Sequence, residues 1–249
     1  VGHQWVKSRF IDSMPPDTVR EFDGGTRLFL PARLGDNPFL RKADAGYEKR
    51  LKLLSPTDRK ALLDGVWELN EGQYFSEFSR DLHVVKPYAI PHDWRRCLTI
   101  DYGLDMLAAL WIAQSPDGHS VVYRELYRPG LIISDAAAQI LACETAGERI
   151  DCRLAPPDLW NRRQETGRSA VELFADSGLD FVKSSNERVA GWLALHELLM
   201  PRKDTDGAVR PRLTIFDTCR NLIRTLPALQ HDKRNPSDTA NTPHELTHA

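Results

Sequence analysis

The feature that most constrains the fold is a stretch at residues 97–114 that has the pattern of a strand, a tight turn and a second strand. Thr99 and Ile100 are β-branched, and Gly103 follows as a residue at which the backbone can turn. The run after the turn is apolar enough to return as a buried partner strand. Asp101 stands where the first strand ends. A carboxylate on a rigid core strand suits metal binding, whereas a turn Asp that hydrogen-bonds its own backbone is the plainer interpretation.

The elements that follow predict where a second carboxylate would lie. Residues 120–127 form a third expected strand, Ser134 caps an expected helix, and a short strand at 152–155 ends just before Asp158. The first three strands must be antiparallel because their connections are too short for crossovers. The helix from Ser134 permits a right-handed crossover that places strand 152–155 parallel to the first. Asp101 and Asp158 would then lie at neighbouring strand ends.

The rest of the chain completes an α/β pattern with a smaller segment in front. The apolar spacing predicts further helices at residues 169–177, 187–200 and 219–229, and strands at 181–183 and 212–216. Strands joined by hairpins and then by helices indicate a mixed sheet flanked by helices. The preceding segment is expected to be α+β, with a hairpin at 18–22 and 26–30, a helix at 39–54 and a proline-containing linker at 86–93. We therefore predict two regions, 1–90 and 91–249.

Composition excludes several classes of function. The net charge of −2 gives no overall attraction to nucleic acid, so any DNA contact must come from local clusters. No apolar run approaches the roughly 18 residues of a membrane span, so no membrane partner is expected. No Gly-x-x-x-x-Gly-Lys phosphate loop is present. The cysteines form no Cys-x-x-Cys pair and favour reduced, buried, cytosolic thiols over disulfides; they are Cys97, Cys143, Cys152 and Cys219.

Carboxylates that converge at strand ends point to metal chemistry. Such groups repel one another unless cations or protons compensate, and their oxygens suit Mg²⁺ or Mn²⁺ rather than zinc. Two such ions roughly 3.5–4 Å apart stabilise the attacking and leaving oxygens of phosphodiester cleavage. Asp105 in the turn and Glu125 on the third strand are auxiliary candidates. A solvated turn Asp and a surface strand Glu are the simpler interpretations of these two.

Basic residues near the expected site are candidates for DNA binding. Arg162, Arg163 and Arg168 lie in the loop just after Asp158. A further basic pair on one side and Arg210–Arg212 on the other flank the loop 204–207, which would form a basic hairpin or flap. Where such residues contact phosphates, binding weakens steeply with salt. Isolated basic pairs are more often solvated surface, and no pattern of base recognition accompanies them. The further pair is Arg202 and Lys203.

Several segments, taken together with their order and spacing, resemble the large subunit of phage terminases. The turn Ile100-Asp101-Tyr102-Gly103 and the third strand resemble the start of its nuclease domain, and the stretch around Asp158 resembles the segment that carries the second acid. The third strand matches through Arg124-Glu125-Leu126-Tyr127, and the stretch around Asp158 matches through Ala155-Pro156-Pro157-Asp158-Leu159-Trp160. Two further matching segments are Leu63-Asp64-Gly65-Val66-Trp67 and Asn186-Glu187-Arg188-Val189-Ala190-Gly191.

The resemblance implies an RNase H-like fold and a metal-dependent endonuclease that cleaves concatemeric viral double-stranded DNA during genome packaging, in the cytoplasm of the bacterial host. By analogy Asp101 and Asp158 hold two Mg²⁺ or Mn²⁺ ions, with Glu245 or His248 as the third ligand. The implied protein partners are the terminase small subunit and the portal protein. Residues 1–90 would be the tail of the packaging ATPase and a linker, and without a phosphate loop no ATP hydrolysis is expected.

Two other functions remain open on the sequence. Actin-like and sugar-kinase ATPases also carry an Asp-x-Gly turn between two strands, as in Asp101-Tyr102-Gly103. They need a second Asp-x-Gly loop and a longer chain, and neither is found. A non-catalytic DNA-binding or docking remnant of a terminase is the other alternative.

Overall fold

The structure, a computed structural model, describes residues 6–11, 13–22, 24–44, 46–47, 51, 73–203, 207–232 and 234–240. The chain divides into two compact units, Val1–Gln73 and Tyr74–Ala249. The predicted functional regions 1–90 and 91–249 stay a prediction. Among the described residues, no helix is long and apolar enough to cross a membrane.

The first unit contains the predicted hairpin, in which Phe22 pairs with Gly25 across the turn. Its helix α2 begins at Pro38, where the side chain of Asn37 accepts the N–H of Leu40 at 3.0 Å. α2 ends at Ala43, and residues 48–50 and 52–54 of the predicted helix lie outside the described residues. The described elements of this unit are η1 (Lys7–Ile11), β1 (Arg20–Phe22), β2 (Gly25–Arg27), η2 (Leu34–Asp36) and α2 (Pro38–Ala43).

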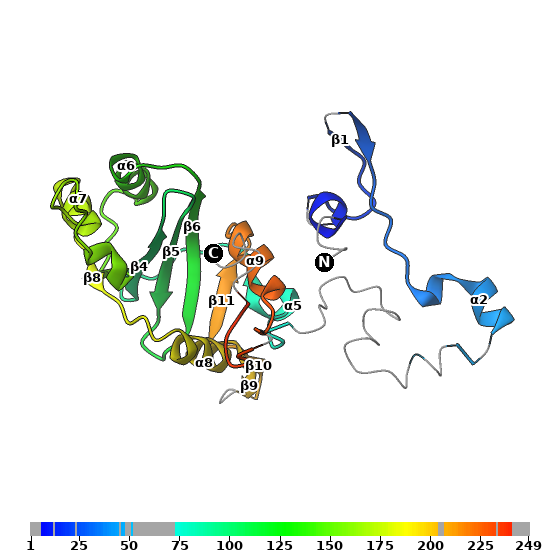
Figure 1. The fold of residues 1–249 in the computed structure, drawn as a ribbon. Coiled ribbons are helices and arrows are strands. Elements are labelled where there is room, and N and C mark those ends of the chain that lie inside the picture. The colour runs from blue at the N-terminus through cyan, green and yellow to red at the C-terminus, as the bar shows by residue number, and fades with distance from the viewer. Residues whose placement is uncertain are drawn as a thin grey trace. The chain divides into compact units, whose positions relative to one another are not determined.

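The second unit is built on a seven-stranded sheet with the spatial order β3-β11-β6-β5-β4-β7-β8 (Figure 1). Only β5 runs antiparallel to its neighbours; the remaining pairings are parallel. Six strands therefore end at the same edge of the sheet. The predicted α/β class with a mixed sheet is confirmed. The strands are β3 (Val84–Val85), β4 (Arg95–Tyr102), β5 (Leu107–Gln114), β6 (Ser120–Arg128), β7 (Cys152–Ala155), β8 (Val182–Lys183) and β11 (Leu213–Phe216).

The predicted strand-turn-strand of residues 97–114 forms the middle of this sheet. β4 and β5 pair along their whole length, from Arg95 opposite Gln114 to Tyr102 opposite Leu107. β5 is covered on both faces, and Trp111 at its centre is fully buried. Because β4 pairs with this buried strand along its whole length, the backbone at the end of β4 is rigidly held.

Helices cover the sheet on both sides. Figure 1 shows α6 and α7 together at the β4–β8 end and α9 beside β11. The capping box of Ser169 and Glu172 starts α7, whereas the predicted cap Ser134 is wrong, because α6 starts one residue earlier at Ile133. The helices are α5 (Arg80–His83), α6 (Ile133–Cys143), α7 (Ala170–Asp176), α8 (Arg188–Leu199) and α9 (Arg220–Thr225), and the 3₁₀ turns are η3 (Pro157–Trp160) and η4 (Leu226–Ala228).

The edge strand β3 was not predicted. Val84 pairs with Ile215 of β11 in parallel, directly after the short helix α5. The buried His83 of α5 forms a hydrogen bond of 2.9 Å between its Nε2 and the carbonyl oxygen of Leu199 at the end of α8. Residues 80–85, just before the predicted linker at 86–93, therefore form a helix and an edge strand of the second unit.

Candidate functional site

Asp101 is the second-last residue of β4, and its side chain is exposed. Ile100 and Tyr102 on either side of it are buried, so the strand alternates between core and solvent at this point. Tyr102 is fixed by its hydroxyl, which donates to the carbonyl oxygen of Leu131 at 2.9 Å. The core thus holds the backbone while the carboxylate of Asp101 projects from the sheet.

Asp158 lies just after β7, in the 3₁₀ turn η3, and is also exposed. The next residue, Leu159, is buried and anchors the turn in the core. β7 runs parallel to β4 with Leu154 opposite Thr99, so both strands end at the same edge of the sheet. The predicted parallel strands with Asp101 and Asp158 at their neighbouring ends are confirmed. Metal binding by this pair stays a prediction.

The turn after Asp101 is closed by short-range backbone hydrogen bonds. The N–H of Gly103 donates to the carbonyl oxygen of Met106 at 2.9 Å. The N–H of Gly130 donates to the carbonyl oxygen of Leu104 at 3.1 Å. The second bond ties the turn to the loop that follows β6. Asp105 is exposed within the turn.

Glu125 on β6 contacts the start of α9. One carboxylate oxygen accepts the backbone N–H of Asn221 at 2.7 Å and its side-chain amide at 2.9 Å, and the other accepts the N–H of Leu222 at 2.9 Å. A carboxylate at a helix N-terminus is stabilised both by these donors and by the helix dipole. Glu125 therefore has a structural role in the described part of the chain.

The loop after Asp158 carries three arginines, and its two ends lie side by side. Arg162 forms an isolated bridge with Ser169, and the N–H of Arg163 donates to the carbonyl oxygen of Arg168 at 3.0 Å. Arg168 pairs with Asp176 of α7 at 2.7 Å. The structure thus brings all three arginines together in one closed loop that begins next to Asp158.

Arg163 also lines a small cavity of about 330 Å³ beneath the turn, together with Tyr102, Leu104 and Ile132. Leu104 and Ile132 are apolar and exposed. The sequence did not single out these two residues, because isolated apolar residues in loops carry no pattern.

The predicted basic hairpin exists, and it is formed by β9 (Arg202–Lys203) and β10 (Val209–Arg210). Arg202 pairs with Arg210 across it, and all four residues are exposed. Arg202 also forms an ion pair with Glu197 of α8. The hairpin thus brings exposed basic residues of two short strands together, and one of them, Arg202, is paired with a carboxylate.

The two candidates for a third ligand, Glu245 and His248, lie outside the described residues. Within the described residues, no group of three or more His, Cys, Asp or Glu side chains is arranged to hold a metal ion. Of the predicted ligand set, Asp101 and Asp158 are the two members that lie within the described residues.

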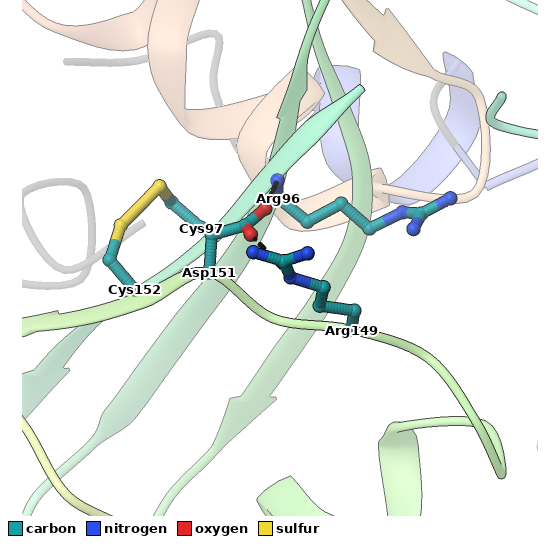
Figure 2. Close-up of a disulfide and its surroundings, with 5 residues drawn as sticks. All are labelled: Arg96, Cys97, Arg149, Asp151 and Cys152. Carbon is teal, nitrogen blue, oxygen red and sulfur yellow. Dashed lines mark hydrogen bonds and ion pairs between the residues drawn. A yellow bond between two sulfur atoms is a disulfide. The ribbon is translucent and has the colours of Figure 1, made fainter. Parts of the chain in front are cut away.

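A disulfide joins the same two strands that carry the candidate acids, between Cys97 of β4 and Cys152 of β7 (Figure 2). The prediction of four reduced cysteines is wrong for this pair, because the parallel register sets the two residues directly opposite each other. Their Cα atoms are 4.8 Å apart. The sequence shows no Cys-x-x-Cys signal for this pair, because its apposition depends on the register of two strands that are far apart in the chain.

Asp151 links the strands beside the disulfide. Its carboxylate accepts the N–H of Arg96 at 2.9 Å, its own N–H donates to the carbonyl oxygen of Arg96 at 2.8 Å, and Arg149 forms an ion pair with it at 2.8 Å. The backbone N–H of Arg96, together with nearby arginines, holds the pKa of Asp151 below its ordinary value.

No protein-family model and no curated protein sequence matches the chain. Among solved structures it is similar to the nuclease domain of the P22 large terminase, with a TM-score of 0.54, 15% identity, and 72% of this chain and 88% of that chain covered. It is also similar to the large terminase of a thermophilic bacteriophage in complex with ADP, with a TM-score of 0.54, 15% identity, and 97% of this chain and 56% of that chain covered.

These similarities show the fold. The second unit has the fold of a terminase large subunit nuclease domain, and the RNase H-like mixed sheet flanked by helices that the sequence predicts is confirmed. The chain spans a little over half of the length of the large terminase from the thermophilic phage.

Proposed function

We propose that the chain is a metal-dependent endonuclease for double-stranded DNA, the nuclease part of a terminase large subunit. The observation that carries the proposal is the parallel pairing of β4 and β7, which brings the ends bearing Asp101 and Asp158 to one edge of the sheet. Both carboxylates are exposed there, on backbone that the core fixes. The terminase-like fold supports the choice of DNA as the substrate.

The donor set fits Mg²⁺ or Mn²⁺. Two exposed carboxylates offer hard oxygen ligands, with no sulfur ligand at the described ends of these two strands. Glu245 or His248 would complete the set, as the resemblance to terminases implies. When bound, two such ions stabilise the attacking and leaving oxygens of the phosphodiester. Glu125 is left out of the proposed ligand set because α9 takes both of its carboxylate oxygens.

The basic residues of the same unit would hold the DNA backbone. The closed arginine loop begins next to Asp158, which supports contacts of Arg162 and Arg163 with phosphates close to the scissile bond. Arg202 and Lys203 on the β9–β10 hairpin offer a second cationic element. Phosphate contacts of this kind position the duplex without reading its sequence.

The wider setting is also part of the proposal. Cleavage of concatemeric viral DNA in the bacterial cytoplasm, a terminase small subunit and a portal protein as partners, and residues 1–90 as the end of an ATPase with its linker all follow from the resemblance. No ATP hydrolysis is proposed for this chain.

The proposal is tested by plasmid cleavage in Mn²⁺ with the wild-type chain and the variant Asp101→Asn. We expect the variant to lose cleavage, by roughly 10²-fold or more, while its folded state is kept, because Asp101 is exposed and lies outside the core. The matched control is Asp93→Asn, an exposed Asp before the start of β4. That variant should cleave like the wild type.

The same experiment separates the nuclease from a docking remnant. If the wild-type chain binds DNA but leaves plasmids intact in Mn²⁺ and in Mg²⁺, the alternative function, a non-catalytic DNA-binding or docking remnant, is correct. If Asp101→Asn cleaves as fast as the wild type, the assignment of Asp101 is wrong.

A further inference from the structure

The disulfide between Cys97 and Cys152 is placed where it can govern the candidate metal site. The two cysteines lie opposite each other on β4 and β7, with their Cα atoms 4.8 Å apart. Asp101 lies near the carboxyl end of β4, and Asp158 lies in η3, just beyond the carboxyl end of β7. A covalent bond between the strands therefore fixes the relative position of the two carboxylates.

β7 needs such a bond more than β4 does. β4 is held by β5 along its whole length, from Arg95 to Tyr102. In β7, only residues 152–154 pair with β4, where they lie opposite residues 97–99. Only Leu154 and Ala155 of β7 pair with β8. β8 itself consists of two exposed residues at the edge of the sheet. Two carboxylates at adjacent strand ends repel each other, and β7 is the strand that would yield.

A redox-independent link lies next to the disulfide (Figure 2). The backbone of Asp151 and its carboxylate both bond to the backbone of Arg96, at 2.8 and 2.9 Å. These bonds hold the beginning of β7 against β4 whether or not the sulfur atoms are joined. Without the disulfide, only these bonds and the short β4–β7 ladder would hold β7, so its far end could shift while the two strands stay paired.

We propose that the Cys97–Cys152 disulfide is a reversible positioning link, whose oxidised form sets the spacing of Asp101 and Asp158 and so tightens divalent-metal binding. The proposal rests on the proposed function, in which these two acids hold the metal. Both cysteines are only half-buried, so a small thiol reagent can reach them. Reduction lowers the affinity for metal, and reoxidation restores it.

The redox step is thiol–disulfide exchange with glutathione disulfide. One protein thiolate attacks a sulfur of glutathione disulfide, which forms a mixed disulfide and releases one glutathione. The second protein thiolate then attacks the protein-bound sulfur of the mixed disulfide and releases the other glutathione. The two cysteines lose two electrons and two protons in total, and the glutathione disulfide gains them.

The test measures Mn²⁺ binding to the full chain by electron paramagnetic resonance, after equilibration with glutathione disulfide and after reduction with dithiothreitol. We expect the dissociation constant for Mn²⁺ to rise on the order of tenfold on reduction. Mutations of residues that orient a metal ligand, without being ligands themselves, have effects of this size. Reoxidation should restore the original value. Peptide mass spectrometry of the oxidised sample should find Cys97 joined to Cys152.

Two variants sharpen the comparison. The double variant Cys97→Ser, Cys152→Ser should show the weaker affinity of the reduced chain under both conditions. Cys143→Ser removes a free, half-buried thiol elsewhere in the unit and should keep the full redox response.

The possible failures are distinguishable. Equal Mn²⁺ affinity in the oxidised and reduced wild type overturns the positioning role and leaves the proposed metal site intact. If Mn²⁺ binds but no peptide joining Cys97 to Cys152 is found after oxidation, the disulfide does not form and the inference is wrong. If neither form binds Mn²⁺, the proposed function fails and the inference fails with it.

Discussion

Replacing Glu148 by glutamine should destabilise the second unit strongly at neutral pH and only weakly in acid. Glu148 lies in the turn after α6, and its side chain is only 7% exposed. One carboxylate oxygen accepts the hydroxyl of Tyr123 at 2.8 Å. The other accepts the guanidinium of Arg124 at 2.9 Å and both the N–H and the hydroxyl of Thr145, at 3.0 and 2.9 Å. Every group around this carboxylate is a donor.

The size of the effect follows from the pKa. Burial by itself would raise the pKa of Glu148, but the hydrogen bonds from Thr145, Tyr123 and Arg124 outweigh it and lower the pKa from 4.5 to about 2. A carboxyl with a lowered folded-state pKa stabilises the folded state above its unfolded-state pKa, here by about 3 kcal/mol. That stabilisation is lost as the pH falls from about 4.5 towards 2.

Urea unfolding, followed by tryptophan fluorescence from pH 7 down to pH 3, measures how the free energy of unfolding depends on pH. We expect Glu148→Gln to cost about 3 kcal/mol of unfolding free energy at pH 7, with a difference from wild type that shrinks steadily below pH 4.5. Glu165→Gln, on an exposed loop residue, is the matched control and should match the wild type throughout. A difference of the same size at pH 7 and pH 3 would refute the reasoning.

Three further substitutions test the packing, capping and surface charge of the same unit. Phe174→Ala removes a fully buried ring that packs against Tyr102 and should cost about 3–5 kcal/mol in the same urea experiment. Ser169→Ala removes the cap of α7 and should cost about 1 kcal/mol, measured by thermal unfolding. Lys86→Ala breaks an ion pair with Asp217 but should change the unfolding free energy by less than about 1 kcal/mol, because the Lys86 side chain is 91% exposed; a larger, salt-independent loss would contradict this.

The sheet and the strand-end position of the two acids were predictable because the signals are local. The β4–β5 turn shows as Asp101 and Gly103 between two apolar strands, and short connections force antiparallel pairing. The parallel neighbour β7 followed from the length of the crossover alone. These inferences need no knowledge of side-chain packing.

The parts that were missed depend on distant partners. β3 is two residues long, too short for a periodic pattern, and exists because β11 offers it an edge. The role of Glu125 depends on α9, which comes much later in the chain. The disulfide depends on register, which a sequence without strand pairing does not specify. Ser134 is a favourable cap by residue type, yet α6 begins at Ile133 and Ile132 stands at its cap position.

The pairing of β3 with β11 also has a consequence for how the protein is made. Val84 is held by Ile215 and His83 by the end of α8, so the partners of this segment come late in the sequence. On the ribosome, the β4–β5–β6 meander can close soon after it emerges, since its contacts are short in sequence. The segment that connects the first unit to the sheet must wait, undocked, until β11 has been synthesised. Strand β3 thus comes before the meander in the sequence, but it joins the sheet only after the meander and β11 have formed.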